Sequence, residues 1–381
     1  MSKFPFCLTL HRFIMMEMQI DEGVFPLAIP HIDTLDKIPA PLLAWYKNAA
    51  RPLPWREEVS PYRVWISEIM LQQTRVAAVI PYFERFLAAL PDAAALAAVP
   101  EDTLMKLWQW LGYYTRARNL RRAAEKIVKD YGGEMPTDFA ALLALPGIGR
   151  YTAAAVSSIA GGAPVPAVDG NVMRIVTRFT CCPDDIGKEK TRREIETALR
   201  PLYRAGRTAG ALNSAFMELG QTVCLPHGAP HCAACPLAAD CLAHAEDCTA
   251  DFPKKSAKKK RRTERLTVLR LLSGGRLALK KRPETGLLAG LYELPHLAGH
   301  QTKNEVRQSL AARGFTIERI TRLPAARHVF THVVWDMTGY EVLLAPPGAE
   351  RASKDTSLVW ADAAALASRY SVPTAFSYYL R

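Results

Sequence analysis

The chain has 381 residues, 49% of them apolar and 23% charged, which allows two or three folded domains and excludes a largely disordered protein. A formal charge of +12 and a pI near 9.3 favour a polyanionic partner, with nucleic acid ahead of an acidic membrane surface. No apolar run reaches the roughly 18 residues of a membrane span. The eight cysteines are too few and too unevenly placed for a secreted disulfide scaffold, so we expect a cytoplasmic protein without a membrane segment.

The first 38 residues carry charges that interrupt any signal-peptide core, and we interpret residues 1–38 as an N-terminal extension. The following region, residues 39–243, is expected to be almost entirely helical. Apolar residues at helical spacing and Pro, Asp and Gly at the boundaries predict its first helices. These helices cover residues 41–48, 61–74, 81–90, 92–99 and 103–111, and Gly112 is the expected C-cap of the last one.

One acidic residue accompanies the apolar face of the helix predicted over residues 61–74. Trp65, Ile69 and Met70 fall on one side of this helix, and Glu68 lies at the edge of that apolar stripe. A carboxylate beside buried aromatic side chains has a raised pKa, which suits a proton donor near neutral pH. A solvated surface glutamate is the alternative interpretation.

Two tyrosines and four arginines follow Gly112. Tyr113 and Tyr114 are expected to project from a turn, and residues 115–122 place the arginines beside them. Basic residues interleaved with exposed aromatics suit contact with a phosphate backbone and an unstacked base. A solvated helix face with ordinary core tyrosines is the alternative.

A glycine turn and a capping aspartate organise residues 142–174. The turn around Pro146, Gly147 and Gly149 leaves backbone N–H groups unpaired at the start of a helix, where a phosphate is favoured. Asp169 follows a Pro-rich loop and is predicted to cap the N-terminus of the next helix. Taken alone, the segment is also compatible with a helical hairpin that has no binding role.

Four cysteines with the spacing C-x7-C-x2-C-x5-C close the helical region: Cys224, Cys232, Cys235 and Cys241. Thiolates gathered this closely in sequence ligate either Zn²⁺ or an iron–sulfur cluster. Zinc ribbons usually supply two C-x-x-C pairs and this chain has one, so we favour a [4Fe–4S] cluster over zinc. No ligand pattern includes the remaining cysteines, Cys7, Cys181, Cys182 and Cys248.

The composition changes after Cys248. Residues 244–265 read as a basic linker, because residues 254–265 contain eight Lys or Arg and one acid. From residue 266 to 381 the apolar period shortens toward two, which predicts an α+β domain. Its expected elements are a hairpin over 266–272 and 276–280, a helix over 303–313, strands such as 332–343 and a final helix near 374–380.

In combination, the motifs of residues 39–381 resemble those of the adenine DNA glycosylases of the MutY family. The matching segments are LPW at 53–55, SEIMLQQT at 67–74, LGYY at 111–114, LPGIGRY at 145–151, VDGNV at 168–172 and the four cysteines. The resemblance implies a mainly α helix-hairpin-helix DNA glycosylase domain with an iron–sulfur cluster loop, followed by a smaller α+β Nudix-like domain. It also implies a monomeric base excision repair enzyme that removes adenine opposite 8-oxoguanine or guanine in double-stranded DNA.

The resemblance also implies roles for individual residues. Glu68 matches the general acid that protonates adenine N7, and Asp169 matches the carboxylate that stabilises the sugar oxocarbenium ion or bonds to it transiently. Cleavage of an N-glycosidic bond needs one protonated acid and one ionised carboxylate, as glycoside hydrolysis generally does. The remaining matches are wedge residues in the opened duplex, Gln73 and Tyr113, a phosphate-binding hairpin, Pro146–Gly149, and base-pocket residues, Arg51 and Trp55.

Tyr151 separates this chain from glycosylases of the endonuclease III type, which also cut the strand. Those enzymes have a lysine nucleophile at this position, and without an amine the imine cannot form. We therefore expect a monofunctional glycosylase. The alternatives are a bifunctional glycosylase/AP lyase and a non-catalytic iron–sulfur protein that binds DNA.

The C-terminal domain resembles a Nudix hydrolase that has lost its metal site. Residues 290–295 match the start of the Nudix box, but residues 307–315 lack three glutamates that would hold Mg²⁺. Phe330, Thr331 and His332 match the family's Phe-Ser-His loop that senses 8-oxoguanine, with threonine in place of serine. The domain is therefore expected to recognise the opposite base without hydrolysing nucleotides.

Overall fold

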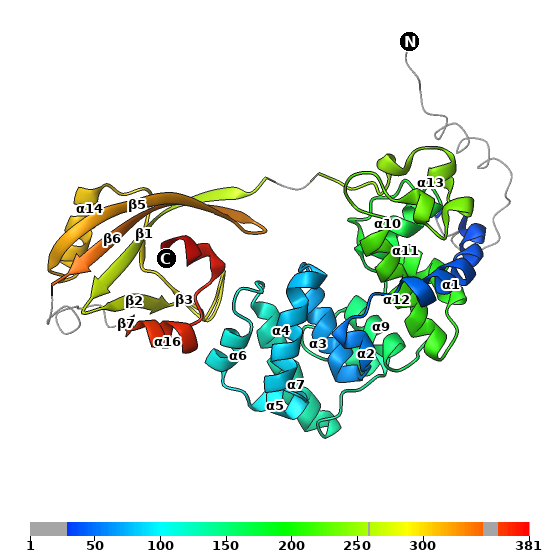
Figure 1. Cartoon of the computed structure of the whole chain (residues 1–381), viewed down its shortest axis with the longest axis horizontal. Helices are drawn as coiled ribbons and strands as arrows, with labels where there is room; N and C mark the ends of the chain where they lie inside the picture. Colours follow the sequence, from blue (N-terminus) through cyan, green and yellow to red (C-terminus); the bar gives the residue numbers. More distant parts are fainter. Residues whose placement is uncertain (1–28, 258–259, 346–356, 381) are drawn as a thin grey trace, which may run out of the picture.

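Two domains make up the protein, a helical one and one built on a β-sheet (Figure 1). The computed structural model describes residues 29–257, 260–345 and 357–380. Within these ranges no helix combines the length and the apolar character that crossing a membrane requires. This architecture confirms the predicted fold class.

The helical domain consists of short helices packed around two adjacent cores. Helices α2 to α9 surround the first core, while α1 and α10 to α12 surround the second. The helices are α1 (Pro39–Ala49), α2 (Pro54–Glu57), α3 (Pro61–Leu71), α4 (Val76–Ala89), α5 (Ala93–Ala98), α6 (Glu101–Leu107), α7 (Thr115–Tyr131), α8 (Phe139–Leu143), α9 (Arg150–Ile159), α10 (Gly170–Phe179), α11 (Glu189–Leu199), α12 (Arg207–Thr222) and α13 (Leu242–Ala245).

Several predicted helix boundaries differ from the structure. Helix α4 begins at Val76 rather than at the predicted residue 81, and Pro81 lies inside it. Helix α6 ends at Leu107 with Trp108 as its C-cap, so Gly112 does not cap it and lies in the following turn. Helix α3 stops at Leu71, because its C-cap Gln72 has a ψ of 111° and the next residue, Gln73, has a left-handed φ of 57°, and neither is helical.

A short helix and buried apolar residues precede the predicted start of the helical domain at residue 39. The 3₁₀ helix η4 (Ile32–Lys37) precedes α1, and Ile29, Leu35 and Ile38 are buried in the second core. Their apolar side chains need this burial, so the last part of the predicted extension belongs to the helical domain. The rest of that extension, including Cys7, lies outside the described residues.

The second domain is built on a mixed sheet in the order β3-β2-β1-β6-β5, with β4 paired to β1 and β7 to β2. Strands β1 and β6 are parallel, while β1 and β2 form the predicted antiparallel hairpin. Its elements are β1 (Arg262–Ser273), β2 (Arg276–Lys281), β3 (Tyr292–Glu293), β4 (His296–Ala298), α14 (Lys303–Ala312), β5 (Ile317–Val329), β6 (Val333–Leu344), β7 (Leu358–Ala361), α16 (Ala363–Ser368) and the 3₁₀ helix η9 (Thr374–Tyr379).

The sheet domain departs from expectation at its start. Strand β1 begins at Arg262, inside the segment predicted as the basic linker 244–265, because its residues pair with β6 from Arg262 onward. The final helix predicted near residues 374–380 is present as the 3₁₀ helix η9. Helix α14 matches the helix predicted over residues 303–313.

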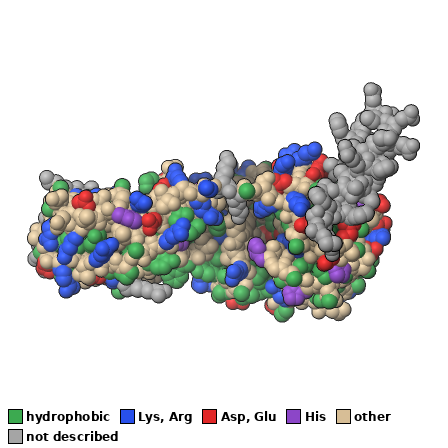
Figure 2. Space-filling model, turned by 90° about the horizontal axis from the view of Figure 1, so that it is seen from above, with side chains coloured by type: hydrophobic (Ala, Val, Ile, Leu, Met, Phe, Trp, Pro, Cys, Tyr) green, Lys and Arg blue, Asp and Glu red, His purple; other side chains and the backbone are tan. Residues whose placement is uncertain are grey.

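The two domains contact each other through α6, α7 and the turn between these helices. Lys106 Nζ donates a hydrogen bond to the carbonyl oxygen of Leu366 at 3.1 Å, and Gln109 Nε2 donates to that of Val372 at 3.3 Å. Arg118 donates to the carbonyl of Ala289, and Leu291 packs into the first helical core. In the space-filling view, basic side chains are spread over both domains of the face shown (Figure 2).

Candidate active site

Glu68 lies on α3 where this helix packs against α9. Its side chain is only 6% exposed, so the alternative of a solvated surface glutamate is wrong. The Tyr151 hydroxyl donates a hydrogen bond to Glu68 Oε2 at 2.7 Å and lies 3.7 Å from the sulfur of Met217. The acid and the residue that replaces a lyase lysine are therefore in direct contact.

The surroundings of Glu68 favour its protonated form. Burial raises the pKa of this carboxyl to about 7, and the hydrogen bond from Tyr151 opposes the rise. The negative charge of Asp169 raises the pKa further, while the charge of Arg56 lowers it. Much of the population near neutral pH therefore carries a proton that Glu68 can donate.

Asp169 caps the N-terminus of α10, as the sequence predicted. Its Oδ1 accepts hydrogen bonds from the backbone amides of Asn171 at 2.8 Å and Val172 at 2.9 Å, and Oδ2 accepts one from Asn171 Nδ2 at 2.7 Å. The pKa of Asp169 is raised overall, because burial outweighs these three bonds, which lower it. The bonds stabilise the ionised form that a positively charged sugar would meet.

A chain of hydrogen bonds links Asp169 to the cysteine loop. Arg174 donates from one terminal nitrogen to Asn171 Oδ1 at 2.9 Å, and from Nε to the carbonyl of Cys224 at 2.9 Å. Gly220 allows Asn171 to approach α12, since a Cβ on this glycine would lie 2.5 Å from the Asn171 Cβ. The orientation of Asp169 thus depends on the segment that carries the first cysteine.

A cleft of about 220 Å³ lies beside Glu68. It is lined by residues of both helical cores, such as Trp55 and Tyr46, and by Arg56 and Met217. Behind it, the fully buried Glu218 forms ion pairs with Arg51 and Arg56. Arg51 also donates to Gln221 at 2.7 Å, and Gln221 lines the cleft. Of the two predicted pocket residues, Trp55 therefore lines the same cleft as Glu68, while Arg51 reaches it only through Gln221.

Glu218 is a site residue that sequence reasoning missed. Burial would raise its pKa, but the hydrogen bonds and charges of Arg51 and Arg56 outweigh burial and lower it. The pattern that identified Glu68, a single acid among apolar residues, could also have identified Glu218. Its neighbours on α12 are Phe216, Met217 and Leu219.

The two predicted wedge residues both have left-handed backbones, with φ of 57° at Gln73 and 49° at Tyr113. Tyr113 is 47% exposed, but Tyr114 is buried, so only one tyrosine projects.

Arg116 holds the segment before Gln73 and the segment before Tyr113 in place. Its guanidinium donates hydrogen bonds to the carbonyl oxygens of Ile69, Met70, Gln72, Leu111 and Gly112.

The predicted basic segment is less available to phosphate than its sequence suggested. Arg116 is buried under the Tyr113 ring, whose centroid lies 5.5 Å away. Arg118 and Arg121 both lie within ion-pair distance of Glu101. Of the four arginines, Arg122 is the exposed one.

The glycine hairpin connects α8 to α9. Gly147 has a φ of 76°, and a Cβ there would lie 2.5 Å from the Asn119 Cβ, so this position requires glycine. Gly149, at the N-cap of α9, has a φ of −92° that any residue can adopt. Of the two glycines in the predicted turn, only Gly147 is therefore required by the backbone. The first backbone amides of α9, which follow this N-cap, have no partner within the helix.

The predicted recognition loop of the sheet domain reaches the helical domain. Thr331 Oγ1 lies 3.4 Å from the Tyr113 hydroxyl, while His332 is exposed. Phe330 packs edge-to-face on Trp335 with ring centroids 4.8 Å apart, which anchors the loop on the sheet. Tyr113 and Thr331 are therefore neighbours in the fold, although they are 218 residues apart in sequence.

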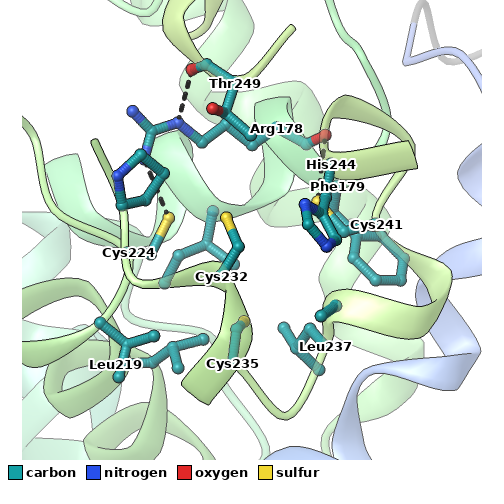
Figure 3. A pocket seen from close by; sticks show the side chains of 14 residues that line it. Arg178, Phe179, Leu219, Cys224, Cys232, Cys235, Leu237, Cys241, His244 and Thr249 are labelled. Atoms are coloured by element: carbon teal, nitrogen blue, oxygen red, sulfur yellow. Dashed lines mark hydrogen bonds between the residues drawn. The ribbon is translucent and has the colours of Figure 1, made fainter. Parts of the chain in front are cut away.

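The four predicted ligands, Cys224, Cys232, Cys235 and Cys241, line one cavity (Figure 3). A terminal nitrogen of Arg178 donates a hydrogen bond to Cys224 Sγ at 3.2 Å, which favours thiolate charge at this sulfur. Apolar side chains such as Leu219 and Leu237 complete the lining. Thiols converging on an enclosed space beside a cation suit a metal centre, so the donor set fits one.

A second cysteine group lies close to this cavity. The sulfur atoms of Cys181 and Cys248 are 3.8 Å apart, and with a carboxylate oxygen of Glu246 they form a set whose atoms all lie within 4.8 Å of one another. The sequence suggested no ligand pattern for these cysteines, because Cys181 lies 67 residues before Cys248 and only the fold brings them together.

The family model for HhH-GPD superfamily base excision DNA repair proteins matches residues 66–201, and the model for NUDIX domains matches residues 267–381. The chain is 32% identical to the adenine DNA glycosylase of Mus musculus over 379 residues, covering 81% of this chain and 72% of that protein. It is 40% identical to the adenine DNA glycosylase of Mycolicibacterium smegmatis over 216 residues, covering 56% and 71%. A solved endonuclease III–DNA covalent intermediate is 25% identical, with a TM-score of 0.49, covering 57% of this chain and 98% of that one. The chain therefore belongs to the adenine DNA glycosylases, the base excision repair DNA N-glycosylases that its motifs resemble.

Proposed function

We propose that this chain removes adenine mispaired with 8-oxoguanine or guanine in double-stranded DNA and leaves the strand uncut. One observation carries the proposal. A buried carboxyl with a pKa of about 7, Glu68, shares a site with an amide-bonded carboxylate, Asp169, whose charge acts on it. Such a pair separates into one proton donor and one anion.

The proposed reaction uses the two carboxyl groups in sequence. Glu68 donates its proton to adenine N7, so the electrons of the breaking C1′–N9 bond pass to a neutral leaving base. Asp169 stabilises the positive charge that develops on the sugar, through its field or a transient bond to C1′. A water molecule then supplies the hydroxyl at C1′, and its proton returns to a carboxylate. The products are free adenine and an abasic site.

Tyr151 supports a reaction without strand cleavage. A lyase needs an amine to form an imine with the sugar aldehyde, and the group beside Glu68 here is a phenol. Burial, together with the nearby carboxylates, raises the pKa of Tyr151 well above its ordinary value, so the phenol keeps its proton. In this proposal, Tyr151 orients Glu68 and does not attack the sugar.

The remaining predicted residues are assigned to DNA binding. Gln73 and Tyr113 fill the space that the extruded adenine leaves, and the turn of Pro146, Gly147 and Gly149 binds a phosphate. Adenine enters the cleft near Trp55 and Arg51. Phe330, Thr331 and His332 contact the opposite base, and the position of Thr331 beside Tyr113 supports this assignment.

We propose a [4Fe–4S] cluster at Cys224, Cys232, Cys235 and Cys241. Within the described residues, no three of these sulfurs lie together within 4.8 Å, the spacing that a single bound ion would bring about. A larger cluster suits this wider arrangement. When bound, it would cross-link the loop that Arg174 and Arg178 hold, and iron near four per purified chain is expected. Zinc in its place would contradict the assignment.

A single-turnover assay tests the reaction. Duplexes carrying adenine opposite 8-oxoguanine, guanine or cytosine are incubated with excess protein, and products are separated with and without alkali. We expect strand breaks only after alkali, fastest opposite 8-oxoguanine, slower opposite guanine and negligible opposite cytosine. Breaks without alkali at a damaged pyrimidine would indicate the lyase, and binding without cleavage of any duplex would indicate a non-catalytic protein.

We also propose that the enzyme acts as a monomer in the cytoplasm, associated with DNA, as the thiol-rich cysteine loop suggests. Sedimentation of the purified protein with and without duplex tests the monomer. A mass of one chain, near 42.2 kDa without DNA, is expected. A stable dimer would contradict it.

A further inference from the structure

Trp110 combines two unfavourable properties. Its φ is 73°, in the left-handed region that a bulky side chain rarely adopts. Its side chain is also 62% exposed, the largest exposure among the large apolar residues that the structure describes. A strained backbone and an uncovered indole both reduce stability, so their coincidence at one residue indicates a role outside folding.

The neighbours of Trp110 hold the strained turn in place without covering the indole. The Trp110 amide donates a hydrogen bond to the Tyr114 hydroxyl at 3.1 Å, and Trp108 Nε1 donates to the carbonyl of Gly112 at 3.0 Å. The preceding residue, Gln109, binds the sheet domain through the carbonyl of Val372. The indole is thus fixed at the junction of the two domains, three residues before Tyr113.

The groove that Trp110 borders is rich in positive charge. It runs between α4, α6 and α16, and its lining includes Arg85, Lys106 and Arg369 against one acid, Asp102. Within the described part of the chain, Arg85 and Arg369 form no ion pair and instead stack on tyrosine rings, with centroids 4.5 Å and 5.4 Å away. Their charges therefore remain available to an anionic ligand.

We propose that Trp110 is a second aromatic contact to DNA, which stacks on a nucleotide while Arg85 and Arg369 neutralise its phosphates. This inference rests on the proposed function, because the duplex must already be opened beside Tyr113. An exposed aromatic ring next to unpaired cations matches the chemistry of a nucleotide with its base and phosphate. A protein segment bound in this groove would have to present an apolar or an acidic surface. The cationic lining of the groove favours DNA over an apolar protein segment.

The decisive variant is Trp110→Gly, because glycine removes the ring and the strain together. We expect affinity for an adenine:guanine duplex to fall on the order of tenfold, as for the loss of one stacked base. The melting temperature should stay equal or rise, since glycine adopts this φ freely. Trp110→Phe keeps a ring and should bind within about twofold of the unchanged protein.

Matched controls separate stacking from nonspecific loss. Tyr378 is 57% exposed and does not border the groove, so Tyr378→Ala should leave affinity unchanged. The double variant Arg85→Gln, Arg369→Gln should reduce the slope of log affinity against log salt by about two, one for each phosphate that is no longer neutralised.

The outcomes distinguish this inference from the proposed function. If the unchanged protein excises adenine and Trp110→Gly binds duplex equally well, the inference is wrong and the proposed function stands. Weaker binding accompanied by a lower melting temperature in Trp110→Gly, but not in Trp110→Phe, would mean that the indole serves folding, which also overturns it. If the unchanged protein excises no adenine from any duplex, the proposed function itself fails.

Discussion

Glu68 in the helical domain and Glu293 in the sheet domain are almost equally buried, at 6% and 5% exposure, yet their partners differ. Glu293 forms an ion pair with Arg282, and His296 Nδ1 lies 3.6 Å from it. Glu68 has no ion pair among the described residues and accepts a hydrogen bond from a phenol. Burial alone therefore does not mark a catalytic carboxyl. The absence of an ion-pair partner is what distinguishes Glu68, because the group then holds a proton that it can donate.

The same contrast holds between the two domains. The helical domain places its uncompensated acid at a cleft large enough for a base. On the sheet domain, the segment that would carry a metal box lies on α14, whose buried residues are Val306 and Leu310, and its one acid, Glu305, forms a capping box with Thr302. The helical domain thus keeps a buried acid without an ion-pair partner at its cleft. The sheet domain uses its acidic residues in an ion pair and a helix cap, which stabilise its fold.

The largest expected effect separates the two glutamates directly. Glu68→Gln should slow adenine release about a thousandfold, because the amide cannot donate a proton in the way the acid does. Glu293→Gln should leave the rate within a few-fold but lower stability by about 3 kcal/mol, since it leaves Arg282 without its partner. Single-turnover rates and denaturant melts of both variants measure these changes. Equal loss of rate in the two would remove the distinction.

The next largest effect is expected at Asp169, and it tests whether this residue acts by its charge or only as a helix cap. Asp169→Asn keeps a good capping residue, so the fold should persist while base release falls a few hundredfold through loss of the anion. Asp92 caps α5 in the same way, accepting from Ala95 N at 2.8 Å, and provides the matched control. Asp92→Asn should retain full activity. Unchanged turnover in Asp169→Asn would mean that this carboxylate has a purely structural role.

The pH dependence of base release sharpens the account of Glu68. Because its pKa is raised to about 7, the active protonated form is present below that pH and disappears above it. Base release should therefore fall about tenfold for each pH unit above 7, or roughly thirtyfold by pH 8.5, and it should also fall at acidic pH, where Asp169 takes up a proton. A rate that follows a midpoint near the ordinary value for glutamate would contradict the proposed proton donor.

Tyr151→Phe should move that pH profile. The Tyr151 hydrogen bond lowers the pKa of Glu68, so its removal should shift the alkaline limb to higher pH. Tyr62 also lies in the helical domain and donates to the carbonyl of Leu90 at 3.0 Å, so Tyr62→Phe serves as the control and should leave the profile in place. The rate in single turnovers across pH measures both. A shift to lower pH would reverse the assigned role of the phenol.

The smallest expected effect concerns the sheet domain. Thr331→Ala should reduce the preference for 8-oxoguanine over guanine about threefold, the loss of one neutral hydrogen bond of less than 1 kcal/mol. Thr331→Ser keeps the hydroxyl and should retain the preference. Both variants should excise adenine opposite guanine at nearly the unchanged rate, because Thr331 lies outside the cleft that holds Glu68. A loss of rate opposite both bases would instead place Thr331 in the chemistry.

Local patterns predicted part of the site from the sequence. Asp169 was identified as a cap because capping depends on residues two and three positions away, and Glu68 because helical spacing places it beside aromatic residues. The ion pairs of Glu218 and the meeting of Cys181 with Cys248 join residues distant in sequence. No local period encodes such contacts, so only the fold reveals them.

The incorrect predictions have a similar origin. Gly112 resembled a helix cap because glycine commonly follows a last turn, but α6 ends at Leu107, and the strained turn after it is held by contacts from Tyr114 and from the sheet domain. Arg116 resembled a phosphate ligand because its neighbours in sequence are basic. Its burial among carbonyl groups depends on how α3 and α7 pack, which propensity does not describe.

The buried guanidinium of Arg116 has a mechanical consequence. A single planar cation anchors the segment before Gln73 and the segment before Tyr113, and no described carboxylate forms an ion pair with it. Displacing either segment would expose carbonyls and a charge at the same time, so Gln73 and Tyr113 are held in a fixed relation to each other. In the proposed DNA-binding role, the two side chains would therefore enter the duplex together.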